Sequence, residues 1–296
     1  GTKMDAISIE RLKQVKFNVT GLRDVLFAQE FNYHNAGEWT DQHIIFVFQA
    51  IVAYLVGIFM TQRMMRKRGP FSLKMPLAAW NGVIAAVSGI CALAMMPEYF
   101  TTLYERGVKD TLCWSQNEYF GGQWIGRAAF ILILARLTEL IDTAFIVLRK
   151  QPLIFLHWYH HTLTLGVSWY TYSGQFSATV HLILLNAMIH TVMYSYYFLT
   201  AIGVRPHPFV AQSITIGQIL QFFYTMYGLI YVGVFKFILG GECKIDAWPF
   251  FIHCFMVVSY TYLFVDFYLN KYSGVKAARA EEKKHLAEKI AEKKID

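Results

Sequence analysis

The chain contains one cluster of histidines, in the string His157-Trp158-Tyr159-His160-His161, and the residues around it are largely apolar. If the string is helical, His157 shares a face with His160 and His161, because side chains three and four residues apart are neighbours on a helix. A neutral imidazole in a low-dielectric site acts as a general base or as a nucleophile. The cluster therefore predicts imidazole catalysis or, if the rings bind an ion, a metal site.

Polar residues recur at helical spacing in three other apolar stretches. They are Arg136, Glu139 and Asp142 in the first, Asn186, His190, Tyr194 and Tyr197 in the second, and Gln218 and Gln221 in the third. Ionisable side chains cost a few kcal/mol or more at bilayer depth, so in a membrane span they mark a functional site. We expect the histidines and the two carboxylates to be catalytic, with the carboxylates orienting the imidazoles through hydrogen bonds, and the other residues to bind substrate.

The elements that carry these residues are predicted to be membrane-spanning helices. Of 296 residues, 55% are hydrophobic, and the mean hydropathy of +0.35 is high for a soluble domain. About 20 apolar residues cross a hydrocarbon core of roughly 30 Å. Seven such spans are predicted, at 43–62, 77–96, 124–147, 153–172, 177–200, 210–235 and 248–270. The expected fold is an all-α integral membrane domain at 43–270, with an N-terminal segment at 1–42 and a charged tail at 271–296.

Lysine and arginine are concentrated in the loops on one side of these spans. The loop at 63–75 has five basic residues and no acidic one, and the next two loops on that side carry Arg149, Lys150 and Arg205. The opposite loops mix both signs. The positive-inside rule makes the basic side cytosolic, with the N-terminal segment in the lumen and the tail in the cytosol. This pattern explains the net charge of +7, and no motif indicates nucleic-acid binding.

The predicted site lies in one layer of the membrane. At 1.5 Å per residue from the basic loops, Asp142, His160, His190 and Gln218 lie roughly 10 to 20 Å inside the cytosolic face. Isolated structural polar residues would scatter in depth, so the convergence of four spans favours a shared active site. His181 and His253 stand alone in their spans and are expected to be hydrogen-bonded structural residues.

Three classes of function remain open at this point: an enzyme that uses imidazole directly, a metal-dependent enzyme, and a receptor or transporter. Iron-dependent membrane desaturases and hydroxylases use histidines in three clustered boxes, whereas this chain has a single cluster, and a mononuclear metal site of His157, His160, His161 and His190 stays open. A seven-span chain with an external N-terminus also describes receptors and transporters. Transporters of the common kinds contain Gly- or Pro-broken half-helices at mid-membrane, and the spans at 153–172 and 177–200 show no such break.

Four strings together resemble the signature motifs of the very-long-chain fatty-acid elongases. They are Glu139-Leu-Ile-Asp142-Thr143, His157-Trp-Tyr-His160-His161, His190-Thr-Val-Met193-Tyr194-Ser-Tyr196-Tyr197 and Thr215-Ile-Gly-Gln218-Ile-Leu-Gln221. Their order and spacing are similar to the family's, and the resemblance covers about residues 40 to 272. One departure is Arg136, where the family's first motif usually begins with Lys. The tryptophan after His157 is similar to the subgroup that takes saturated or monounsaturated chains.

The resemblance implies a 3-oxoacyl-CoA synthase that joins malonyl-CoA to an acyl-CoA with loss of CO2. It implies no cofactor beyond these two substrates, no metal, and separate reductases and a dehydratase as partners. It also implies that spans two to seven form a barrel around a tunnel open to the cytosol, with span one outside it. The acyl group is expected to pass to His160 before the condensation, and a ternary complex in which the histidines act only as acid and base is the alternative. Association into a homo-oligomer stays open.

Three further features follow from the predicted topology. Cys113 and Cys243 lie in loops that face the oxidising lumen, so we expect a disulfide between them. Asn18-Val19-Thr20 is a glycosylation sequon in the luminal segment. Lys293 and Lys294, near the end of the cytosolic tail, resemble the dilysine retrieval signal of endoplasmic reticulum membrane proteins.

Overall fold

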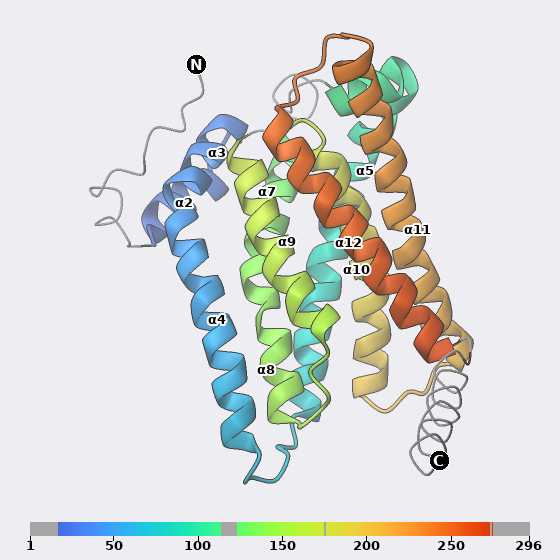
Figure 1. The fold of residues 1–296 in the computed structure, drawn as a ribbon. Coiled ribbons are helices and arrows are strands. Elements are labelled where there is room, and N and C mark those ends of the chain that lie inside the picture. The colour runs from blue at the N-terminus through green and yellow to red at the C-terminus, as the bar shows by residue number, and fades with distance from the viewer. Residues whose placement is uncertain (1–16, 114–122, 175, 273, 275–296) are drawn as a thin grey trace, which may run out of the picture.

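The computed structural model describes residues 17–113, 123–174, 176–272 and 274. The regular elements of these residues are all helical, and the longer helices run side by side as a bundle (Figure 1). In chain order they are α2 (Val19–Leu26), α3 (Tyr33–Gln42), α4 (Ile44–Met65), α5 (Lys74–Cys113), α7 (Gln123–Glu139), α8 (Ile141–Leu148), α9 (Phe155–Ser173), α10 (Thr179–Ala201), α11 (Pro208–Gly233), the π-helical turn η1 (Val234–Ile238) and α12 (Ala247–Tyr272).

Among the residues that the structure describes, five helices are long and apolar enough to cross a membrane: α4, α5, α10, α11 together with η1, and α12. Many of their large apolar side chains point outward, among them Ile90 and Leu93 on α5 and Phe255 on α12, each more than 60% exposed. In a water-soluble bundle such residues would be buried. Together with the all-helical fold, this outward apolar surface agrees with a multi-pass membrane protein.

Two predicted spans differ from the observed helices. The span expected at 124–147 is divided into α7 and α8 at Leu140, whose φ of −58° and ψ of −22° stay in the helical region, so hydrogen bonding is interrupted without a reversal of direction. The span expected at 77–96 belongs to a longer element, because α5 continues past Pro97 to Cys113. Gly107 has a φ of 78°, a conformation that glycine adopts without a Cβ clash, and it separates the last turns of α5 from the rest.

The N-terminal helices α2 and α3 pack against α7 and α9. Trp169 on α9 donates from its indole nitrogen to the carbonyl oxygen of Thr40 at 2.8 Å, and Arg127 on α7 donates to the carbonyl oxygen of Ala28 at 2.6 Å. Trp39, Leu165 and Trp169 are buried in the core that these helices share. The described part of the segment before α4 is therefore folded onto the bundle.

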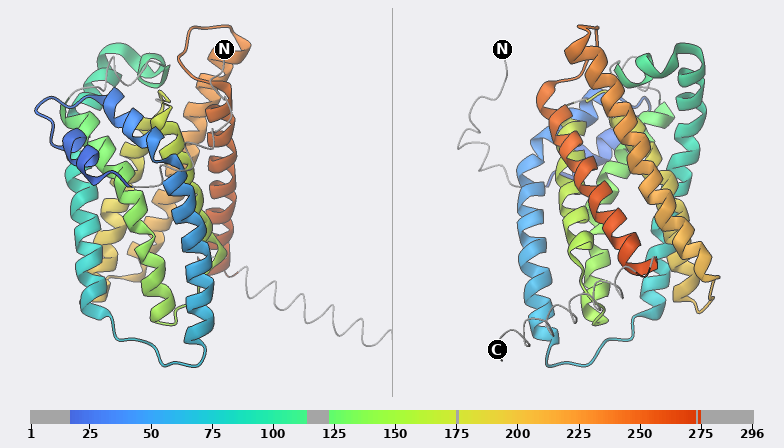
Figure 2. Two further views of the ribbon diagram at one scale, coloured as in Figure 1. Left: turned by 90° about the vertical axis from the view of Figure 1, so that its left-hand side faces the viewer. Right: turned by 45° about the vertical axis from the view of Figure 1, so that its right-hand side comes forward.

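The two ends of the bundle differ in the way that their loops are joined. At one end, a disulfide links Cys113, the last residue of α5, to Cys243 in the loop before α12, which is the pair expected from the sequence. At the other end lie the three basic loops (Figure 1). Two of these loops are in contact, because Lys150 donates from Nζ to the carbonyl oxygen of Arg68 at 2.9 Å. The turned views show α4 at the edge of the bundle and α11 beside α12 (Figure 2).

Candidate active site

A cavity of about 590 Å³ lies among α5, α8, α9, α10, α11 and α12. Ten of the twelve predicted catalytic and substrate-binding residues line it: Asp142, His157, His160, His161, Asn186, His190, Tyr194, Tyr197, Gln218 and Gln221. The other two, Arg136 and Glu139, do not line it and are only 5% and 2% exposed. The four polar stretches of the sequence therefore meet around one space.

Three imidazoles enter the cavity from the first two turns of α9. The ring centroids of His157 and His161 are 4.4 Å apart, and those of His160 and His161 are 5.5 Å apart. The ring of His160 packs beside Tyr260 of α12, with 5.0 Å between centroids. No described residue makes a hydrogen bond to a ring nitrogen of His160, so both nitrogens are available to a bound substrate.

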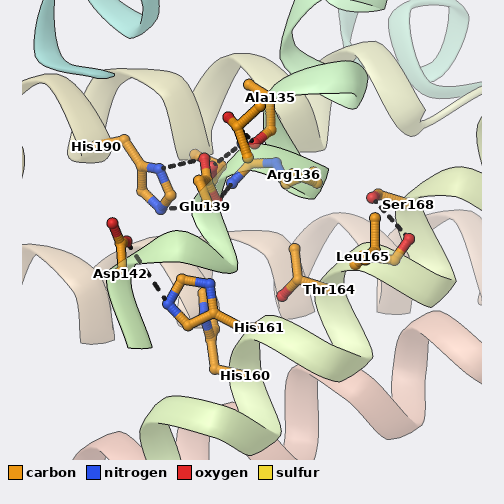
Figure 3. Close-up of polar contacts among 12 residues, drawn as sticks. Ala135, Arg136, Glu139, Asp142, His160, His161, Thr164, Leu165, Ser168 and His190 are labelled. Carbon is orange, nitrogen blue, oxygen red and sulfur yellow. Dashed lines mark hydrogen bonds and ion pairs between the residues drawn. The ribbon is translucent and has the colours of Figure 1, made fainter. Parts of the chain in front are cut away.

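A buried charged network lies behind His190 (Figure 3). Arg136 donates to a carboxylate oxygen of Glu139 at 2.8 Å and to the amide oxygen of Asn186 at 2.5 Å. The second carboxylate oxygen of Glu139 lies 3.4 Å from Nδ1 of His190. A buried charge is tolerated when it is paired and hydrogen-bonded. The guanidinium of Arg136 pairs with one carboxylate oxygen of Glu139, and the other carboxylate oxygen is directed at the imidazole of His190.

Asp142 has partners that the sequence did not indicate. Its two carboxylate oxygens accept hydrogen bonds from the indole of Trp80 and from the hydroxyl of Tyr194, both at 2.5 Å. The nearest imidazole nitrogen, Nε2 of His161, is 3.9 Å away, beyond hydrogen-bond distance. The prediction that the carboxylates orient imidazoles through hydrogen bonds is wrong for Asp142, because α5 and α10 supply better-placed donors.

Several residues at the site were missed in the sequence. Trp80 and Asn81 come from α5, a span that showed no polar motif, and Asn81 is only 4% exposed. A lone asparagine in an apolar span was the one available signal, because Trp80 does not differ in type from a membrane-anchoring tryptophan. Tyr260 also contacts the site, through a hydrogen bond from its hydroxyl to the carbonyl oxygen of His160 at 3.1 Å.

The cavity reaches the end of the bundle that carries the basic loops. Arg149 at the end of α8 and Lys271 in the last turn of α12 line it there. Tyr197 is 43% exposed on the same side. Gln218, which also lines the cavity, donates to the sulfur atom of Met193 at 3.2 Å. Cations at this mouth suit an anionic group, such as a phosphate, that does not need to enter the apolar interior.

The metal-site alternative receives no support from side-chain geometry. Among the described residues, no three side chains of histidine, cysteine, aspartate or glutamate are placed to hold a metal ion together. The two isolated histidines lie elsewhere: His181 hydrogen-bonds to the hydroxyl of Tyr99, and His253 bonds to the carbonyl oxygen of Pro249 one turn earlier, at 3.0 Å. Asn18 is exposed at the start of α2. Lys293 and Lys294 lie outside the described residues.

Comparison with known proteins finds one family and several similar sequences. The sequence model of the GNS1/SUR4 family, abbreviated ELO, matches residues 39–282. The chain is 35% identical to long chain fatty acid elongase 1 of Caenorhabditis elegans, over 89% of this chain and 92% of that protein. It is 33% identical to very long chain fatty acid elongase 6 of Homo sapiens, over 88% and 97% of the two chains, and 33% identical to the Drosophila melanogaster protein of that name, over 83% and 78%.

Proposed function

This chain belongs to the GNS1/SUR4 family, and from that premise we propose that it is the condensing enzyme of fatty-acid elongation. It is a multi-pass membrane protein with a role in fatty acid elongation. In the proposed reaction, malonyl-CoA loses CO2 and its carbanion attacks the carbonyl carbon of a long-chain acyl group, giving 3-oxoacyl-CoA. The observation that carries the proposal is the cavity lined by four imidazoles with cations at its mouth.

The arrangement of charges suits a CoA thioester, and the two substrates would occupy it in turn. The phosphates of CoA are attracted to Arg149 and Lys271 at the mouth, while the thioester lies deeper, beside His157, His160 and His190. A cavity shielded from water protects a carbanion and a reactive acyl group from side reactions. The acyl chain continues into the apolar interior of the bundle.

The proposed order of chemistry begins with transfer of the acyl group to His160. The unprotonated ring nitrogen of His160 attacks the thioester carbonyl, the C–S bond breaks, and the proton of the other ring nitrogen passes to the CoA thiolate, which leaves as the thiol. After malonyl-CoA loses CO2, its carbanion attacks the acyl-imidazole, the C–N bond breaks, and the imidazolate takes up a proton from solvent to regenerate His160. The absence of a described protein partner on either His160 ring nitrogen supports this role. In the alternative, a ternary complex, His160 acts only as a general base.

We propose seven membrane spans, with α7 and α8 counted as one. The 19 residues of α9 have a length of about 28 Å at 1.5 Å per residue, close to the thickness of a hydrocarbon core of roughly 30 Å. Spans two to seven form the barrel around the cavity, with its mouth toward the cytosol. The proposed location is the endoplasmic reticulum membrane, where the reductases and dehydratase of the cycle would act on the product.

We also propose that the substrate is a saturated or monounsaturated acyl-CoA of intermediate length, because Trp158 follows His157. The direct test uses the purified protein with an acyl-CoA and malonyl-CoA labelled in its free carboxylate. Release of labelled CO2 that depends on the acyl-CoA, with a product two carbons longer, is the expected result. A panel of acyl-CoAs then tests the chain preference, and a preference for twenty-carbon polyunsaturated chains would refute it. Absence of both CO2 and lengthened product would refute the function.

A further inference from the structure

A phenol, an aliphatic hydroxyl and an imidazole form a chain of hydrogen bonds that begins on α4. The hydroxyl oxygen of Tyr54 lies 2.8 Å from Oγ1 of Thr143, and the same Oγ1 lies 2.9 Å from Nε2 of His157. Tyr54 is 9% exposed and Thr143 is fully buried, so solvent does not compete for these bonds. This chain of hydrogen bonds joins α4, α8 and α9 and ends on the imidazole of His157, which lines the cavity.

The direction of these hydrogen bonds follows from the protons that are available. The phenol proton of Tyr54 has one acceptor among the described residues, Oγ1 of Thr143. The single hydroxyl proton of Thr143 is then left for Nε2 of His157. Nε2 accepts this bond, so the neutral ring carries its own proton on Nδ1. No described residue accepts a hydrogen bond from that Nδ1, which leaves it for a bound molecule.

His190, on the other side of the site, has a different kind of partner. Its Nδ1 lies 3.4 Å from the carboxylate of Glu139, an anion that stabilises an imidazolium when the ring takes up a proton. His157 is held by neutral hydroxyl groups, which orient the ring but do not compensate a positive charge. The amide NH2 of Asn186 lies 3.3 Å from Nε2 of the same ring, so both ring nitrogens of His190 face protein groups. Nδ1–H of His157, by contrast, is left to donate to a bound molecule.

We propose that Tyr54 and Thr143 are positioning residues that hold His157 as the Nδ1–H tautomer. In this form His157 donates a hydrogen bond to the carbonyl oxygen of the bound thioester as negative charge develops there. The inference rests on the proposed function and assigns a donor within that same site. Loss of one oxyanion donor reduces kcat by about 100- to 1,000-fold. Loss of orientation alone leaves the donor present part of the time, so the expected effect is smaller, about 10-fold, with KM little changed.

The tautomer can be measured directly in the full-length protein, labelled with 15N-histidine and reconstituted in lipid nanodiscs without substrate. The imidazole signals of His157 are identified by their loss in His157→Gln. In the wild type, Nε2 of His157 is expected to have the chemical shift of an unprotonated nitrogen. In Thr143→Val the shift moves toward a mixture of tautomers, and Thr143→Ser, which keeps the hydroxyl, restores it. Tyr54→Phe, which removes the first donor, shifts it in the same direction as Thr143→Val.

Kinetics supply the second readout, with a control on the preceding helix. The hydroxyl of Thr138 is hydrogen-bonded to the carbonyl oxygen of Ala135 in its own helix, at 2.8 Å. Thr138→Val therefore removes a hydroxyl without changing the hydrogen bonds among Tyr54, Thr143 and His157. We expect Thr143→Val to lose about 10-fold in kcat, and Thr138→Val and Thr143→Ser to stay close to the wild type. A protonated Nε2 in the wild type, or equal kcat for Thr143→Val and Thr138→Val, would overturn the proposal. Failure of the wild type to condense acyl-CoA with malonyl-CoA would refute the proposed function instead. The two failures can be told apart, because the nitrogen chemical shifts report the tautomer of His157 without turnover.

Discussion

Oε1 of Glu139 lies 3.4 Å from Nδ1 of His190, and Oε2 of the same carboxylate lies 2.8 Å from a guanidinium nitrogen of Arg136. One buried anion is thus shared between a permanent cation and an imidazole. Arg136 balances the carboxylate at rest, and a proton gained by His190 would be stabilised by the same carboxylate. Charge balance and proton transfer therefore depend on one side chain.

Replacing Glu139 should reduce both folding stability and activity. In Glu139→Gln, Arg136 stays buried without an anion, a change that costs about 3–5 kcal/mol in buried pairs, and His190 loses the carboxylate that stabilises its protonated form. Thermal unfolding and condensation assays measure the two effects. In the double variant Arg136→Met with Glu139→Gln, stability should return while activity stays low. Recovery of activity in the double variant would show that Glu139 acts only by balancing Arg136.

Asp142→Asn should lower condensation by about 100-fold, in the range of a lost catalytic group, while the protein still folds. The asparagine amide puts an NH2 group in place of one carboxylate oxygen, so Trp80 and Tyr194, which donate to different oxygens, cannot both keep their acceptor. Trp80→Phe removes only the indole donor and should have a milder effect of a few fold. Asp41→Asn, at an exposed position on α3, serves as the control. Turnover near the wild-type rate in Asp142→Asn would exclude Asp142 from the reaction.

The covalent order predicts a mass increase on His160 equal to the acyl group after incubation with acyl-CoA alone. Free CoA should be released before malonyl-CoA is added, and double-reciprocal plots for the two substrates should be parallel. His160→Ala should give no adduct and no early CoA, because the nitrogen that would carry the acyl group is missing. Intersecting lines, with an unmodified peptide containing His160, would favour the ternary complex and leave His160 as a general base.

The disulfide should contribute to stability and not to chemistry. Cys113 and Cys243 are 130 residues apart in sequence, so the link closes a long loop, and native disulfides typically contribute about 2–4 kcal/mol. Cys113→Ser with Cys243→Ser should lower the unfolding temperature by several degrees and keep kcat within about twofold of the wild type, because the link lies at the end of the bundle away from the cavity mouth. Peptide mapping without reduction should recover the linked pair, and recovery of both thiols alkylated would contradict the link.

The sequon at Asn18 provides a test of orientation. Asn18 also caps α2, with its side chain accepting from the amide nitrogen of Gly21 at 2.9 Å, so an Asn18 variant would change folding and glycosylation together. Thr20→Ala removes the sequon and keeps the cap. In microsomes we expect the wild type to lose mass on deglycosylation and Thr20→Ala to be insensitive. A wild type without glycan, together with protease cleavage of an N-terminal tag from the cytosolic side, would place this segment on the opposite side from the one that we propose.

Helical periodicity in the sequence was sufficient to select ten of the polar residues that line the cavity. Polar side chains at spacings of three and four in apolar spans must face protein or water, so His157, His160, Asn186 and His190 had to converge. The positions of the loops along the chain were sufficient to indicate which cysteines could meet.

Helix packing alone decided which partner each polar group obtained. Asp142 accepts from Trp80 and Tyr194, and His157 is connected through Thr143 to Tyr54 on a helix expected to lie outside the barrel. Tyr54 stands alone among apolar neighbours and Trp80 has only Asn81 beside it, so periodicity carries no signal for either. The sequence by itself determined an all-helical membrane fold and a polar layer, because both depend on local spacing and hydropathy. Hydrogen-bond partners between helices depend on how the helices rotate and tilt against one another, and that is determined only when the whole bundle packs.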